Sequence, residues 1–247
     1  MIVLGFDTAT RATAVALRLT DGRTMQARDD PPSGAHPGHA TRLLEMAREL
    51  LAGAGIAWSG IDRVAVGVGP GTFTGLRVGV ATARGLAQSL SAELVGVSSP
   101  RALALAALAA EPARSGELGA VLAVIDARRG EAFAAAYEAG DGGAPQELAS
   151  PRALAPQELA SVVAHVDEAD RRHRWLAVGD GAVRFREQLE AAGVLTPPDS
   201  SVLHLVSAAA VCELGAHAAT ASLHELVPDY RRRPDAELAL VAGRESS

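Results

Sequence analysis

The stretch VAVGVGPG at residues 64–71 decides which fold the chain can adopt. The apolar residues at 63–68 predict a buried strand, and the glycines that follow predict a tight turn. A helix is expected after this turn, from residue 74 to about residue 90. A similar stretch, LAVGDG at residues 176–181, precedes a second expected helix at about 183–192. The same order in both halves of the chain indicates a duplication.

Two further strands support the duplication, because each is apolar and ends in a carboxylate. Residues 2–7 read IVLGFD and end at Asp7, and residues 122–126 read LAVID and end at Asp126. Residues 12–19 are expected to form a β-hairpin with the first strand, and a third strand is expected at 23–28. The expected order of elements in each half is hairpin, helix, strand, glycine turn and helix. This order, present twice, resembles the architecture of actin-like ATPases and sugar kinases. We therefore predict an α/β fold of the duplicated two-domain actin-like (ASKHA, ribonuclease H-like) type.

The predicted domains are residues 1–98 and 99–225, and we expect the tail at 226–247 to return to the first domain. Apolar spacing and turn residues predict the remaining elements, and they predict no regular structure for the polar stretch at 140–146. These elements are helices at 39–51, 100–110, from 157, and 207–220, with strands at 93–97, 120–126, 131–138 and 175–178.

Composition excludes several classes of protein. All 23 basic residues are arginine, so chemistry that needs lysine, such as Walker A phosphate binding or a Schiff base, is excluded. The single cysteine, Cys212, rules out an internal disulfide and a multi-cysteine metal site, and we expect it to be a small buried residue. The 29 acidic and 23 basic residues give a formal charge of −6, so we do not expect the chain to bind nucleic acid alone.

The sequence predicts a cytoplasmic protein without a membrane partner. The longest uncharged apolar run, at residues 102–110, is well short of the ~20 residues that span a bilayer. Asp7 and Arg11 interrupt the region where a signal peptide would have its apolar core.

The segment GPGTFTGLRVGVATARGLA at residues 69–87 closely resembles a characteristic stretch of the TsaB (YeaZ) family, bacterial proteins that help to make threonylcarbamoyladenosine in tRNA. Other stretches that resemble the family are LGFDTAT at 4–10, HATRLL at 39–44, GVSS at 96–99, DARRGE at 126–131 and VPDYRR at 227–232. The resemblance therefore covers nearly the whole chain and is weak only between residues 140 and 194.

The resemblance implies a non-catalytic scaffold subunit without a cofactor or metal of its own. It implies binding to TsaD as a heterodimer, action with the ATPase TsaE on adenosine 37 of tRNAs that read codons beginning with A, and contact with tRNA only through the complex. When alone, the chain is expected to be able to form a homodimer. The residues expected to form or support the partner interface are Thr8, His39, Leu43, Leu44, Ala47, Gly71, Thr72, Phe73, Thr74, Gly75, Leu76, Arg77, Gly79, Val80 and Ala83.

The glycines of residues 69–87 leave two structural alternatives open. The turn is either an anion site at a helix start or a tight strand-to-helix connection, and its spacing favours the connection. Thr72 or Thr74 is expected to cap the helix. The stripe of Gly75, Gly79, Ala83 and Ala87 permits close approach by a partner helix or by the chain's own sheet. On the partner alternative, Gly79→Arg would abolish partner binding, and a folded variant with unchanged binding would contradict it.

Two catalytic alternatives rest on other residues. Asp7, Asp126 and Asp180 stand where actin-like kinases place carboxylates around a magnesium nucleotide, so an independent kinase or ATPase that uses them with the glycine turns is the rival interpretation. His36 and His39 are three residues apart, but Pro37 and Gly38 lie between them and no third ligand is near, so a metal site is disfavoured.

Overall fold

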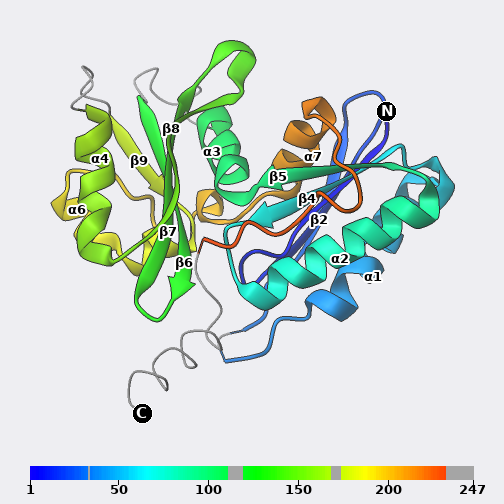
Figure 1. Ribbon diagram of the computed structural model, residues 1–247, viewed down its shortest axis with the longest axis horizontal. Coiled ribbons are helices and arrows are strands. Elements are labelled where there is room, and N and C mark those ends of the chain that lie inside the picture. Colours follow the sequence, from blue (N-terminus) through cyan, green and yellow to red (C-terminus); the bar gives the residue numbers. More distant parts are fainter. Residues whose placement is uncertain (33, 111–118, 168–173, 232–247) are drawn as a thin grey trace.

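The computed structural model describes residues 1–32, 34–110, 119–167 and 174–231, which form two mixed β-sheets with helices on their faces (Figure 1). The first sheet has the strand order β3-β2-β1-β4-β5. Its strands are β1 (Val3–Asp7), β2 (Thr13–Arg18), β3 (Thr24–Asp29), β4 (Arg63–Gly69) and β5 (Glu93–Ser98). The hairpin of β1 and β2 is antiparallel, as the sequence predicts, and β4 lies parallel to β1 on its other side.

Two helices cover one face of the first sheet. They are α1 (His39–Ala54) and α2 (Phe73–Leu90), which lie side by side on the side of the sheet away from the second half of the molecule (Figure 1). Leu43 and Leu51 of α1 and Val80 of α2 pack on Leu4 and Val66 of the sheet. The helical spacing of apolar residues thus gives each helix one buried face and leaves the opposite face outside.

The second sheet has the order β8-β7-β6-β9. Its strands are β6 (Ala120–Arg128), β7 (Glu131–Ala139), β8 (Pro145–Leu154) and β9 (Trp175–Val178). Its outer face carries α4 (Leu159–Asp167), α5 (Asp180–Arg184) and α6 (Arg186–Ala191). Four 3-10 turns complete the described elements: η1 (Trp58–Gly60), η2 (Asp141–Gly143), η3 (Pro156–Glu158) and η4 (Val202–His204).

Two helices fill the space between the sheets. They are α3 (Ser99–Ala110) and α7 (Ala208–His217), and their apolar residues share one core with both inner sheet faces. Strand β6 is apolar on both sides because Val121 faces this shared core and Leu122 faces α4. Cys212 of α7 is fully buried in the shared core, which confirms the structural role predicted for it.

Two predictions of local structure were wrong. Part of the polar stretch at 140–146 opens β8, because Gln146 and Glu147 project from an edge strand where polar side chains stay in solvent. The single helix expected at 183–192 is two short helices, because Phe185 leaves helical geometry at φ −110° and ψ 30°.

Helix α7 lies within residues 99–225 but packs on β1 and β4 of the first sheet, where Gly215 lets it approach Ala65 closely.

The return of the tail to the first domain is seen for residues 226–231. Leu226 is buried in the core of the first sheet, and the amide of Asp229 donates to the carbonyl of Val68 at 2.8 Å. Residues 232–247 lie outside the described residues. Among the residues that are described, no helix has both the length and the apolar character needed to cross a membrane.

Candidate functional site

The turn between β4 and α2 is tied to the hairpin of β1 and β2. The amide of Thr72 donates to the carbonyl of Ala9 at 2.7 Å, and the amide of Leu76 donates to the carbonyl of Thr72 at 3.0 Å. Thr72 is the N-cap residue, but its hydroxyl accepts no hydrogen bond from the amides of α2, whose residues are all described. The predicted side-chain cap at Thr72 was therefore wrong, and Thr74 lies exposed in the first turn.

The small-residue stripe of α2 packs against the chain's own residue Thr8. The buried hydroxyl of Thr8 donates to the carbonyl of Gly75 at 2.7 Å. A Cβ atom at Gly75 would lie 2.0 Å from the Thr8 carbonyl oxygen, and one at Gly79 would lie 2.4 Å from Thr8 Oγ1. These distances select the chain's own sheet as the neighbour of the stripe at these two glycines. Gly79→Arg is therefore expected to disrupt the fold and is not a clean test of partner binding.

Most of the predicted interface residues lie inside the first domain. The three exposed ones are Leu44 of α1, which is 44% exposed, and Thr74 and Arg77 of α2. Gly71, Thr72 and Phe73 are half-buried. The buried members are Thr8, His39, Leu43, Ala47, Gly75, Leu76, Gly79, Val80 and Ala83. These buried residues hold α1 and α2 on the sheet and so support the outer surface of the two helices.

The outer surface of α2 is lined by small residues. This surface was not predicted from the sequence. Thr74, Ala81 and Gly85 recur at intervals of seven and four residues and are exposed. A Cβ atom at Gly85 would have no neighbour within 4 Å in the part of the chain that the structure describes. Helix α2 carries Arg77 and Arg84 but no carboxylate. The sequence signal for this surface is Gly85. A glycine in the middle of a helix costs about 1 kcal/mol relative to alanine, and no neighbour within the described chain accounts for it.

His39 begins α1 and is part of the interior. Its Nδ1 lies 2.9 Å from the hydroxyl of Thr13 in a buried hydrogen bond. Burial lowers the pKa of His39, and the nearby carboxylate of Asp29 opposes this shift. His36 is exposed, and no cluster of three His, Cys, Asp or Glu residues that could hold a metal ion occurs within the described ranges.

Asp7 at the end of β1 is buried at the junction of the two halves. Its Oδ2 accepts a hydrogen bond from the hydroxyl of Ser99 at 2.5 Å, and its Oδ1 accepts one from the amide of Ala9 at 2.8 Å. Burial raises the pKa of Asp7, and these two hydrogen bonds oppose the shift. Both carboxyl oxygens are thus engaged by the chain, at the strand end where an actin-like kinase needs a carboxylate for its metal nucleotide.

Asp126 and Asp180 meet at the equivalent end of the second sheet. The amide of Asp126 donates to Oδ1 of Asp180 at 2.9 Å, so an internal carboxylate occupies an amide of this strand end. The carboxylate of Asp126 accepts hydrogen bonds from Arg184 at 2.9 Å and Arg128 at 3.0 Å. Burial raises the pKa of Asp180. The arrangement satisfies each carboxylate internally and can serve as a structural clamp between β6 and α5.

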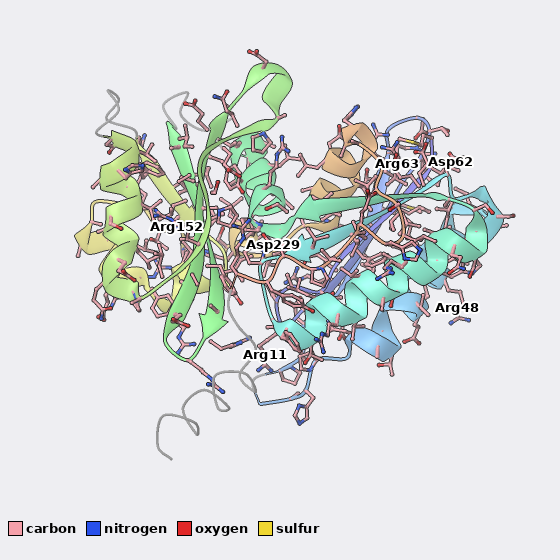
Figure 2. The ribbon with its side chains drawn as sticks, viewed as in Figure 1. Arg11, Arg48, Asp62, Arg63, Arg152 and Asp229 are labelled. Atoms are coloured by element: carbon pink, nitrogen blue, oxygen red, sulfur yellow. The ribbon has the colours of Figure 1, made fainter. Side chains whose placement is uncertain are left out.

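The outer side of α1 contributes the neighbouring part of the exposed surface. Leu44 is a large exposed apolar residue, and Arg48 one turn further along projects away from the sheet (Figure 2). Together with Thr74, Ala81 and Gly85 of α2, Leu44 forms what we call the outer helix surface. This surface combines an exposed apolar side chain on α1 with a row of exposed small residues on α2, a combination suited to helix packing.

These features define an actin-like α/β protein of two duplicated halves, with a pair of helices exposed on the first half. A hexokinase of the ROK type from Thermus thermophilus has the same fold, with a TM-score of 0.50 at 16% identity over 87% of this chain and 100% of that one. That likeness concerns the fold alone.

The family model described as "TsaD: tRNA N6-adenosine threonylcarbamoyltransferase" matches residues 31–244. The chain belongs to this family, and within it to the TsaB (YeaZ) proteins, as the resemblance predicted. The tRNA threonylcarbamoyladenosine biosynthesis protein TsaB of Escherichia coli is 29% identical over 94% of this chain and 95% of its own length. The structure of YeaZ from Pseudomonas aeruginosa matches with a TM-score of 0.73 at 28% identity, over 93% of this chain and 99% of that chain.

Proposed function

We propose that the chain is a non-catalytic scaffold subunit in the biosynthesis of threonylcarbamoyladenosine in tRNA, which binds TsaD through the outer helix surface. Relatives that carry the TsaB name support the pathway, and the TsaD-type family model supports a partner of the same fold. In this proposal TsaE joins the pair, adenosine 37 is modified by the complex, and tRNA is bound only through it. We place this activity in the cytoplasm and propose domains at residues 1–98 and 99–225, with α7 of the second segment packed on the first sheet.

The observation that carries the proposal is the contrast between the two faces of α2. The inner face uses Gly75 and Gly79 to approach Thr8, so packing within the chain explains those glycines. The outer face has Gly85 in open space within the described chain, next to the exposed Ala81. A partner helix that packs against this row of small residues would give Gly85 a neighbour that the described chain does not supply.

The carboxylates support the non-catalytic part of the proposal. An independent kinase needs carboxylate oxygens directed at a magnesium ion. Asp7 is engaged by Ser99 and Ala9, whereas Asp126 is engaged by Arg128 and Arg184. Each carboxylate is thus already used in hydrogen bonds within the chain, which supports a structural role for it.

The test is co-purification of the chain with TsaD from the same organism and tRNA modification by the pair with TsaE. Gly85→Arg places a bulky cation in the outer helix surface and is expected to weaken pairing at least about a hundredfold and to abolish modification. Such a loss corresponds to about 2.8 kcal/mol of binding free energy. The matched control is Ala164→Arg, on an exposed face of α4 in the second half, which should pair normally.

Normal pairing of a folded Gly85→Arg variant would contradict the proposed surface. Failure of the unaltered chain to pair with TsaD, together with stabilisation of the isolated chain by nucleotide, would favour the kinase interpretation instead. A ligand at one hundred times its dissociation constant stabilises a protein by about 2.7 kcal/mol. A homodimer of the isolated chain should also be lost in Gly85→Arg if it uses the same surface.

A further inference from the structure

The segment after α7 crosses the first domain as a strap, which we define as residues 219–231 and which is coloured orange to red in Figure 1. The amide of Ala221 donates to the carbonyl of Leu94 at 2.8 Å, and the amide of Asp229 donates to the carbonyl of Val68 at 2.8 Å. Leu226, only 5% exposed, anchors the middle of the strap in the core. Asp229 lies near the centre of the molecule in Figure 2, where the strap passes the end of β4.

The strap ends on the first turn of α2. The rings of Tyr230 and Phe73 are 5.1 Å apart between centroids, and the guanidinium carbon of Arg77 lies 3.7 Å from the centroid of Phe73. Nε of Arg77 donates to the hydroxyl of Tyr230 at 3.0 Å. Phe73 and Arg77 are four residues apart and so lie on the same side of the helix. We call this three-residue cluster the latch.

The first turn of α2 lacks the usual local stabilisers of a helix start. The N-cap Thr72 supplies no side-chain hydrogen bond to the amides of this fully described helix, and the first turn contains no acidic residue. Arg77 places a positive charge close to the positive end of the helix dipole, which opposes helix formation there. The ring of Tyr230 and the guanidinium group of Arg77 both contact the Phe73 ring, and both contacts are attractive. The latch therefore replaces local capping with a tertiary contact.

We propose that Tyr230 is a positioning residue for partner binding, which holds the first turn of α2 in the conformation that the partner recognises. This inference rests on the proposed function. Thr74 lies in the same turn as Phe73 and forms one end of the outer helix surface. If the turn frays, the residues that flank it leave their positions, and partner binding must restore them. Tyr230, near the end of the strap, thus affects the affinity of the outer helix surface for the partner without having to contact the partner itself.

The experiment measures TsaD affinity and amide hydrogen exchange for variants of the full chain. Tyr230→Ala is expected to weaken binding about tenfold and to speed exchange of residues 73–77. Tyr230→Phe keeps the ring contact and is expected to bind within about threefold of the unaltered chain. The double variant with Arg77→Ala should bind no more weakly than the weaker single variant, because both remove the same latch.

Val227→Ala is the matched control, since Val227 is 60% exposed on the same strap and lies outside the latch. Its binding should be unchanged. Equal weakening by Val227→Ala, or normal binding and exchange in a folded Tyr230→Ala variant, would overturn the positioning role. Failure of the unaltered chain to bind TsaD would overturn the proposed function as well, so the two failures are distinguishable.

Discussion

The glycine turns of the two halves follow equivalent strands but lead into different helices. The turn after β4 leads into the continuous 18-residue α2, whereas the turn after β9 leads into α5 of five residues and α6 of six. Helix α2 leaves Gly85 and Ala81 exposed, while Ala182 of α5 and Leu189 of α6 are buried on the second sheet. The two copies of the duplicated unit therefore differ: the first has a long helix with an exposed row of small residues, whereas the second uses two short helices for its own core.

The carboxylates of the two halves differ in the same manner. Asp7 is held in the interior by a neutral hydroxyl and an amide, whereas Asp126 is held by two arginines whose side chains are about half exposed. Asp7 lies against Ser99, where the first half joins α3, so its environment links the halves. The carboxylate of Asp126, in contrast, is bound by Arg128 and Arg184, which both belong to the second half.

The largest expected effect comes from adding a methyl group at a glycine packed against a carbonyl oxygen, either Gly75 in the first turn of α2 or Gly179 just before α5. In Gly75→Ala the new Cβ would lie 2.0 Å from the carbonyl oxygen of Thr8, and in Gly179→Ala it would lie 2.1 Å from that of Val124. Gly179 also has φ +108°, which L-residues rarely adopt. Each variant should lose about 3 kcal/mol or more of unfolding free energy, measured by denaturant titration.

Equal losses would show that both turns are close-packed junctions of the fold. A loss below about 1 kcal/mol at Gly75 would break the comparison, because the inner face of α2 would then have room to spare. The inner stripe would in that case be available for a partner, contrary to the assignment made from Thr8.

The sequence predicted the elements of the first half more fully than those of the second. Residues 63–90 gave a correct strand, turn and helix because apolar periodicity and glycine punctuation agree there. Strand β8 was missed because Pro145 and the polar residues after it obscure an edge strand, and the break at Phe185 was missed because that residue fits the apolar pattern of one helix. The local pattern of apolar residues does not show where a tertiary contact ends a helix.

The sequence identified the segment that contains the candidate site but not which side chains of that segment are exposed. The family resemblance directed attention to residues 69–87, but periodicity alone does not tell the inner stripe from the outer one. The deciding information is the position of Thr8, which is more than sixty residues earlier in the sequence and donates to Gly75. Tyr230 of the latch was missed for the same reason, since its partner Arg77 lies far away in the chain.

The second expected effect is a smaller, pH-dependent loss at the carboxylate of the first half. Ser99→Ala removes the hydroxyl that donates to Asp7 and should cost about 2 kcal/mol at neutral pH, measured by denaturant unfolding. Because the folded-state pKa of Asp7 is already raised from 3.8, stability is lost as pH rises through that raised pKa. The variant raises the pKa further, so its penalty should shrink as pH falls toward 4.

The matched change in the second half is Arg184→Ala, which removes one of two half-exposed partners of Asp126. Its cost should be below about 1 kcal/mol, since Arg128 remains and water reaches the pair. If Arg184→Ala lost more unfolding free energy than Ser99→Ala, the contrast between the buried carboxylate of Asp7 and the partly exposed ion pairs of Asp126 would be wrong.

The last pair of variants separates helix conformation from packing at two exposed glycines. Neither Gly85 of α2 nor Gly193 after α6 would bring a Cβ atom within 4 Å of any described neighbour. Gly85 has helical geometry, so Gly85→Ala should stabilise the isolated chain by about 1 kcal/mol, seen as a rise in Tm. Gly193 has φ +78°, so Gly193→Ala should destabilise it by about 1 kcal/mol through backbone strain alone.

Opposite signs at two uncrowded positions would show that Gly85 contributes nothing to the stability of the chain by itself. Its presence in the middle of α2 would then have to be explained by something that approaches the helix from outside. If Gly85→Ala also weakens TsaD binding while raising Tm, the methyl group is tolerated by the chain and rejected by the partner. A loss of stability in Gly85→Ala would instead mean that the outer face of α2 is already occupied within the chain, and the first half would no longer differ from the second.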